Sequence, residues 1–492
     1  ALLSGMDGDY FLDDGIIRLQ VFHIYSPMVD MVLNGTISTQ GELNLDAEVR
    51  DLNFKRFAHK FPYPVAGHGV FHGQVGGTIS YPIFRGDLKA DEVTMNGVTL
   101  TKVHSLVYYE NGIVTLDRTG FHQGEKGKVS ARLHYDTHSD VLRGTMDVEN
   151  FDVGALLALG NQKEDRVGGA MTSHIWVGGT RDNPSLGVTG EIAAGTVAGY
   201  PVTDAALDVS LSNHVLTIDR LTGKQGDGSC SATGTVDFNG MMDVDVTAND
   251  IALGLYTGLA GVDEPVSGTA SVTAHVGGTA QSPVADVSLS AKDGGVRCGT
   301  FDALAGEIQV RGRVVRVNQL TVHKYVDGVD YTARVHGTLP LHALTADVDE
   351  ELSAAEQIDL TLSLDHADLS LLPVFSREIE WALGRTEGEV TVRGSLAAPR
   401  IKGSLRIRDG AVKLKAIETP ITEIEVQVDA LGDSIAIREC TGRMGTGSYL
   451  LTGHTGLSGL RPANYEFMLV MNALSVKTSF YDGPLTGALK LT

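Results

Sequence analysis

A short phrase, Val-Gly-Gly-Thr followed closely by proline, recurs along this chain at long intervals. The copies VGGTISYP, VGGTRDNP, VGGTAQSP and the variant VRGSLAAP begin at Val75, Val177, Val276 and Val392. In each copy a proline stands four residues after the Thr or Ser, and successive copies are 102, 99 and 116 residues apart. A proline at a fixed offset after glycine is typical of a turn between two strands. The phrase therefore predicts a repeat of about 100 residues.

The spacing of the phrase predicts where the repeats begin and end. We expect a partial repeat over 1–77, whole repeats over 78–179, 180–278 and 279–394, and a partial repeat over 395–492. The third interval is longer because of an acidic stretch, 343–357, which has no strand pattern and is expected to be a surface insertion. The chain opens and stops within the strand pattern, so we expect it to be a middle section of a longer protein.

Between the turn phrases most of the sequence alternates between apolar and polar residues. The clearest stretch is IDLTLSLD, in which Ile358, Leu360, Leu362 and Leu364 alternate with Asp, Thr and Ser. A period of two predicts a half-buried strand. The apolar members of the other alternating stretches are Val129, Ala131, Leu133, Val244, Val246, Val287, Leu289, Leu405, Ile407, Val426 and Val428.

Such alternation is typical of an antiparallel sheet with one wet face, and we expect an all-β fold. Helix is expected only where Asn or Asp precedes a short apolar run, which predicts one short N-capped helix per repeat. These runs are ENFDVGALLALG, NDIALGLYTGLAG, HADLSLLPVFSREIEWALG and NALSVKTSF. The pattern leaves open whether the apolar face packs on a second sheet in a sandwich or lines an open trough.

Charge and composition exclude several classes of function. The formal net charge is -22, from 39 Lys and Arg against 61 Asp and Glu, which argues against a nucleic-acid partner and against anionic membrane surfaces. No run of 18 apolar residues and no signal peptide is found. Cys230, Cys298 and Cys440 are too far apart in sequence to indicate a zinc site or a disulfide framework.

No residue pattern indicates catalysis, a metal or a cofactor, and we expect a protein that is not an enzyme. His68 and His72 are spaced like a helical pair, but flanking glycines predict a strand or turn, in which they are too far apart to share a metal. His134 and His138 could meet only across a turn. The Asp-rich start at Asp7 lacks the terminal Glu of a calcium loop.

The repeat pattern resembles the TamB and AsmA-like family of repeating β-groove proteins. The resemblance covers essentially the whole chain and is strongest in GTVDFNGMMDVDVTANDIALG and VSGTASVTAHVGGTAQSPVADVSL. It implies an elongated, curved antiparallel sheet that forms a taco-like groove, whose apolar face carries phospholipid between membranes. It also implies a periplasmic location, anchoring in the inner membrane, and an Omp85-type outer-membrane barrel as a partner through regions outside this chain.

Two hypotheses of function follow. In the first, the fifteen apolar residues named above form the lipid-binding face of a groove. In the second, the chain is an extracellular structural or adhesive repeat protein, in which the same residues fill the dry cores of closed sandwiches. The absence of Pro- or Ser-rich linkers at the repeat boundaries favours the groove.

Overall fold

The computed structural model describes most of the chain. The described residues are 5–26, 29–56, 64–159, 166–180, 182–259, 266–296, 299–326, 328–341, 356–371, 378–395, 398–458, 461–477 and 481–492. They divide into two compact units, unit 1 (1–226 with 231–239) and unit 2 (227–230 with 240–492). Nearly all of the acidic stretch expected to be an insertion, 343–357, lies outside the described residues, as does Cys298.

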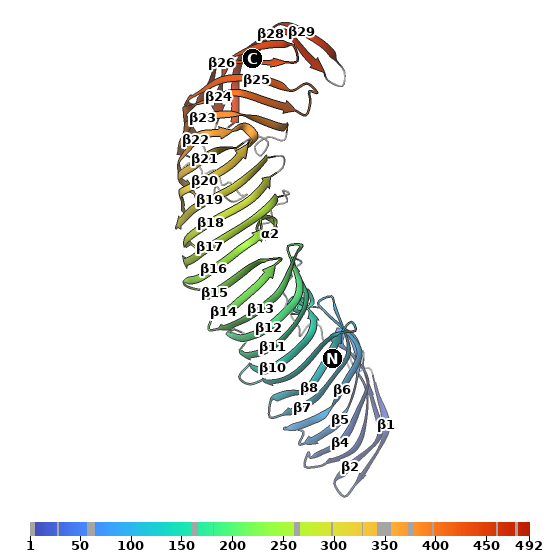
Figure 1. The fold of residues 1–492 in the computed structure, drawn as a ribbon. Coiled ribbons are helices and arrows are strands. Elements are labelled where there is room, and N and C mark those ends of the chain that lie inside the picture. Colours follow the sequence, from blue (N-terminus) through green and yellow to red (C-terminus); the bar gives the residue numbers. More distant parts are fainter. Residues whose placement is uncertain are drawn as a thin grey trace. The chain divides into compact units, whose positions relative to one another are not determined.

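Unit 1 is an open sheet in which each strand pairs in antiparallel fashion with the next strand of the sequence (Figure 1). Its strands are β1 (Gly5–Asp13), β2 (Ile16–Tyr25), β3 (Val29–Ser38), β4 (Leu43–Asn53), β5 (Val65–Gly77), β6 (Pro82–Met95), β7 (Val98–Glu110), β8 (Ile113–Gln123), β9 (Gly127–Asp136), β10 (Val141–Asp152), β11 (Val167–Gly179), β12 (Pro184–Val197), β13 (Tyr200–Ser212) and β14 (Val215–Gln225).

Unit 2 follows the same rule. Its strands are β16 (Met242–Ala252), β17 (Val266–Thr279), β18 (Ser282–Val296), β19 (Gly299–Arg311), β20 (Val314–Val326), β21 (Val329–Pro340), β22 (Gln357–Asp368), β23 (Ile379–Ser395), β24 (Pro399–Leu414), β25 (Ile421–Gly432), β26 (Ser434–Met444), β27 (Gly447–Ser458), β28 (Arg461–Lys477) and β29 (Asp482–Leu491). The residues of one further strand, β15 (Gly228–Asp237), are divided between the units. The all-β, antiparallel prediction is confirmed.

The recurrent phrase forms a hairpin turn in all four places. It joins β5 to β6, β11 to β12, β17 to β18 and β23 to β24, and its last glycine has a positive φ of 77°, 85°, 81° and 113° in turn. In each turn the Thr or Ser side-chain oxygen accepts a hydrogen bond from the backbone N–H three residues later, at 3.1–3.2 Å. The hydroxyl residue is thus part of the turn chemistry, together with glycine and proline.

The expected helices form at two of the four places. Helix α1 (Val153–Leu159) follows β10, and α2 (Leu253–Leu259) follows β16. Asp152 caps α1, because its Oδ1 accepts a hydrogen bond from the backbone N–H of Ala155 at 2.8 Å. In the third run, of which 372–377 lie outside the described residues, the described part contains the 3-10 turn η3 (Leu369–Leu371) and the start of β23. No described helix is long and apolar enough to cross a membrane.

The fourth helix prediction is wrong. The described part of NALSVKTSF belongs to β28, where Leu474 is 5% exposed and pairs with Leu485 of β29. A neighbouring strand supplies the backbone hydrogen bonds that a helix would supply internally, so the backbone of the described part of this run is paired as a strand. The sequence run alone does not reveal that such a partner strand follows.

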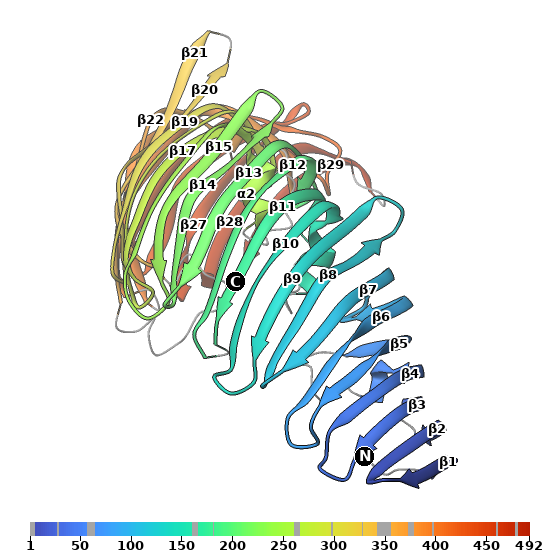
Figure 2. The same ribbon diagram turned by 90° about the horizontal axis from the view of Figure 1, so that it is seen from below.

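Bulges and glycines bend the strands. Register shifts interrupt many of the ladders, for example between Val317 and Leu320 of β20, and a bulge bends the strand that carries it. The green to orange strands of unit 2 curve along their length in Figure 2. Gly337, Gly388 and Gly403 have φ of 133–143°, and a Cβ atom on any of them would lie 2.0–2.1 Å from a carbonyl oxygen of the adjacent strand.

We expect Gly403→Ala to lower the free energy of unfolding by about 1–3 kcal/mol, because the new Cβ meets the Glu389 carbonyl and the backbone conformation is strained. Gly277→Ala is the matched control in the same unit, since its new Cβ would lie 3.5 Å from the Met242 carbonyl oxygen and its φ is not positive. Urea unfolding measures both. Equal stability of the two variants would contradict this account of the bend.

Candidate functional site

The apolar residues of unit 1 line up on one face of its sheet. Directly opposed residues of antiparallel strands share a face. From Ala131 on β9 the row of opposed residues runs across five further strands through Met146, Ile175, Val188, Val209 and Ile218. From Leu133, on the same face, it runs in the other direction through Leu116 and Val107. Three of the predicted residues, Val129, Ala131 and Leu133, therefore belong to one continuous apolar face.

Helix α1 covers part of this face. Val129, Val148 and Phe151 are 2%, 1% and 0% exposed, and residues of α1 pack against the same cluster. The Asn96 side-chain amide donates a hydrogen bond to the carbonyl of Ala158 on α1 at 2.8 Å, which ties the helix to the turn after β6. Val129 thus lies beneath the helix, whereas Ala131 and Leu133 remain half-buried.

Unit 2 has the same arrangement over more of the predicted residues. One row begins at Val246 and continues through Ala274, Val287, Ile308, Val317, Gly337, Leu360, Val392 and Ile401. The row beside it contains Leu289, Gly306, Leu320, Val335, Leu362, Val390, Gly403 and Ala430. Val244, Ile358 and Leu364 belong to the same face because they alternate with these residues along β16 and β22.

The face continues to the later strands of unit 2. Leu364 is linked through Gly388 to Leu405, Val428 and Ile437, and Ile407 pairs with Val426. Val426 and Cys440 are buried in an apolar cluster with Tyr449 packed against it, and burial raises the pKa of the Cys440 thiol. All twelve predicted residues of unit 2 therefore share one face.

This face is open in each unit. Of the fifteen predicted residues only Val129, Ile358 and Val426 are buried, and the others are half-buried. Within the described ranges of each unit, every strand belongs to one sheet of sequential neighbours, and no second sheet packs on the apolar side. The described residues therefore lack the face-to-face sheet packing of a sandwich.

The sequence prediction missed many members of the face. Val335 and Val390, which flank Leu362 directly, lie in stretches that also alternate and could have been found by the same rule. The glycines of the face could not be found in this way. Gly337 takes the place of an apolar side chain in its row, and only the register places it beside Leu360.

The opposite face of each sheet is polar and carries cross-strand ion pairs. In unit 1 His174 Nδ1 lies 2.7 Å from Asp147 Oδ1. In unit 2 Arg311 contacts both carboxylate oxygens of Asp286 at 2.7 and 2.9 Å, and Arg393 Nε lies 2.9 Å from Asp359 Oδ1. Exposed pairs of this kind add little stability, but they fix which residues face water.

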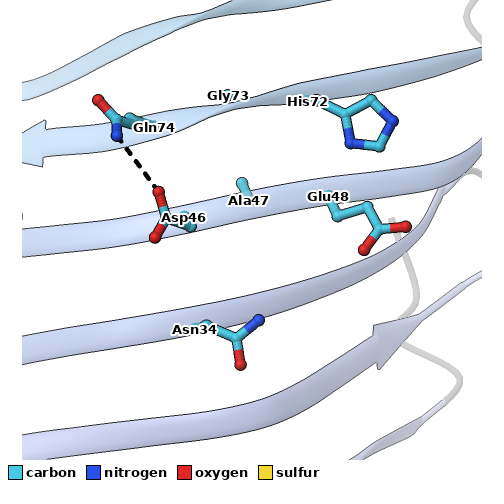
Figure 3. A pocket seen from close by; sticks show the side chains of 7 residues that line it. All are labelled: Asn34, Asp46, Ala47, Glu48, His72, Gly73 and Gln74. Atoms are coloured by element: carbon cyan, nitrogen blue, oxygen red, sulfur yellow. Dashed lines mark hydrogen bonds between the residues drawn. The ribbon is translucent and has the colours of Figure 1, made fainter.

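His68 and His72, which are spaced like a metal-binding pair, belong to β5 in unit 1. His68 hydrogen-bonds to Asp51 at 2.6 Å, whereas His72 lies across from Glu48 in a shallow depression over β3, β4 and β5 (Figure 3). In that depression the Gln74 amide donates to Asp46 at 3.3 Å. Among the described residues, no group of three or more His, Cys, Asp or Glu side chains could hold a metal ion.

No protein-family model matches this chain, and no curated protein matches it.

We expect the pKa of His275 to lie above its usual value of 6.5, because the ring hydrogen-bonds to Asp245 and lies near Asp243 and Asp286. The stabilising interaction is then fully present below pH 6.5 and is lost as the pH rises through the raised pKa. Asp245→Asn should move the pKa back toward 6.5, and Asp208→Asn in unit 1 should leave it unchanged. NMR titration of the His275 ring measures this, and an unchanged pKa in Asp245→Asn would contradict the assignment.

Proposed function

We propose that the apolar face of each unit binds the acyl chains of phospholipids, and that the chain is a periplasmic section of a protein that transports phospholipid between the inner and outer membranes. The observation that carries the proposal is the series of opposed apolar residues on a face that no second sheet covers within the described residues. An example is the row from Val246 to Ile401, in which Gly337 is the one glycine.

The chemistry of the two faces suits a lipid. Acyl chains gain about 0.8 kcal/mol per CH₂ group removed from water, and the apolar rows offer a surface for them across successive strands of each unit. A headgroup remains in water at the open side. Because neighbouring rows present the same Val, Leu and Ile chemistry, a chain that moves from strand to strand exchanges equivalent contacts and meets no deep trap.

The bend of the strands supports a groove rather than a flat surface. Positive-φ glycines and bulges bend the strands, and Gly337, Gly388 and Gly403 belong to the apolar face itself. We propose that this bending turns each apolar face inward into a taco-like groove, with α1 and α2 packed on part of it.

The order of elements supports the proposed repeats of about 100 residues. The four hairpins that contain the recurrent phrase begin at β5, β11, β17 and β23, six strands apart, and α1 and α2 follow β10 and β16, also six strands apart. A six-strand repeat with one short helical connection would supply a groove of constant chemistry. The segments 78–179, 180–278 and 279–394 then correspond to whole repeats.

Location and partner rest on the resemblance to the TamB and AsmA-like family. By that resemblance the full protein would be anchored in the inner membrane and would meet an Omp85-type barrel through regions outside this chain. The proposal assigns no catalytic step and requires no cofactor. The adhesive hypothesis requires closed sandwiches, and the described residues of each unit form a single sheet instead.

We expect photo-crosslinkers at Leu360, Leu362 and Leu364 to capture phospholipid, and crosslinkers at Thr361 and Ser363 to capture none. The reason is that successive residues of β22 point to opposite faces. Mass spectrometry of the crosslinked products measures the capture. Equal capture from both sets would contradict the proposal.

We expect Leu362→Asp to abolish lipid transfer between donor and acceptor vesicles while the protein stays folded. On an open face the carboxylate remains hydrated, but it interrupts the apolar row between Val335 and Val390. In a closed core the same unpaired charge would cost several kcal/mol and unfold the unit. Thr361→Asp places the same charge on the polar face and should leave transfer intact. Unfolding of Leu362→Asp, or equal transfer by both variants, would refute the open groove.

A further inference from the structure

The polar face of unit 2 carries a cluster of basic residues on β23 and β24, in a chain whose net charge is -22. We call this cluster the basic patch; its members are Arg385, Arg400, Lys402, Arg406 and Arg408. The four residues of β24 alternate with apolar-face residues such as Leu405 and Ile407, and all five are exposed. The strand β24 therefore presents a local charge opposite in sign to that of the whole chain.

The members of the basic patch form no ion pair among the described residues. Within the described part of unit 2, no carboxylate forms an ion pair with any of the five. By contrast, Arg311 of β19 is paired with Asp286, and Arg393, on β23 itself, is paired with Asp359. Arg406 donates a hydrogen bond to the Gln427 side-chain oxygen at 3.3 Å.

Two carboxylates share this side of β23. Glu387 lies directly opposite Arg406 in the register, and Glu389 accepts a hydrogen bond from Ser363 at 3.3 Å. On the polar side of β23 and β24, the five cations of the basic patch therefore outnumber the carboxylates.

The register places like charges directly opposite each other twice. Arg385 opposes Arg408, and Arg393 opposes Arg400. Like charges in such positions are destabilising. Asp359 forms an ion pair with Arg393. Asp368 of β22 lies opposite Arg385, but its Oδ2 accepts a hydrogen bond from the backbone N–H of Gly384, and no ion pair joins it to Arg385 or Arg408 among the described residues. An external anion would relieve this repulsion.

Exposed apolar side chains flank the basic patch on the same side of the sheet. Trp381 and Leu383 precede Arg385 at alternate positions of β23 and are 36% and 46% exposed. Leu431 of β25 lies opposite Lys402 and is 64% exposed. Lys and Arg together with Trp and Leu are the composition of surfaces that bind at a bilayer interface.

We propose that the basic patch docks on the headgroups of an anionic phospholipid bilayer, with Trp381, Leu383 and Leu431 entering the interface. An acidic polypeptide would satisfy the cations, but it gives no role to the three apolar side chains, so we favour the membrane. At about 0.1 M salt the Debye length is about 10 Å, and the local patch then outweighs the distant negative charge of the chain. The patch is on the side opposite to the proposed acyl-binding face.

The two tryptophans of the sequence, Trp176 and Trp381, allow a direct test. In the full chain carrying Trp176→Phe, fluorescence reports Trp381 alone. We expect its emission to shift to the blue with vesicles of phosphatidylcholine containing about one third phosphatidylglycerol, and not with phosphatidylcholine alone. The reciprocal variant, Trp381→Phe, should show no shift, because Trp176 belongs to unit 1. Lipid taken up by the apolar face alone would leave the emission of Trp381 unshifted, because Trp381 lies on the polar face. Failure of this proposal and failure of the transport proposal are therefore distinguishable.

A charge-matched pair of triple variants completes the test. The first triple variant should weaken binding to the anionic vesicles by at least about tenfold; it combines Arg400→Ser, Lys402→Ser and Arg408→Ser. The second triple variant removes the same charge from unit 1 and should leave binding unchanged; it combines Lys126→Ser, Arg143→Ser and Arg220→Ser. Equal weakening by both triple variants, or the absence of a Trp381 shift, would overturn the proposal. Binding of poly-L-glutamate without binding of anionic vesicles would also overturn it and assign the patch to an acidic protein partner.

Discussion

The antiparallel backbone register is the constraint on which both faces of each unit depend. Every strand of a unit is hydrogen-bonded to its sequence neighbours, and each side chain takes its face from that pairing. A slip of one residue would move Leu362 from its place between Val335 and Val390 to the wet side. The ion pair of Arg393 with Asp359 on the other side of the same strands opposes such a slip, because the shifted register would move both charges onto the apolar face.

Much of this arrangement could be predicted from local pattern. Strict alternation in Ile358–Asp365 assigned the faces of β22, and the recurrent phrase located four hairpins. The curvature could not be predicted in this way. A strand bends at a bulge such as that between Leu364 and Ala367 only when the partner strand has one residue fewer at that point, and a single strand does not show this. Burial of Val129 likewise depends on where α1 packs, and the fate of the apolar run in β28 depends on β29.

Local charge and total charge lead to different conclusions for this chain. The net charge of -22 argues against anionic surfaces for the molecule as a whole. The register, however, brings Arg385 opposite Arg408 and gathers four cations along one side of β24. Screening limits each charge to its surroundings, so the composition of one strand pair can determine a contact that the total charge disfavours. An apolar face and a basic patch on opposite sides of one sheet could thus serve separate lipid contacts.

The central claim is that the apolar faces hold phospholipid acyl chains. Native mass spectrometry of the protein purified without detergent tests it most directly. The account predicts bound phospholipid, with loss of that lipid in Leu362→Asp and retention in Thr361→Asp. Protein that carries no lipid after gentle purification, or that carries equal amounts in both variants, would contradict it.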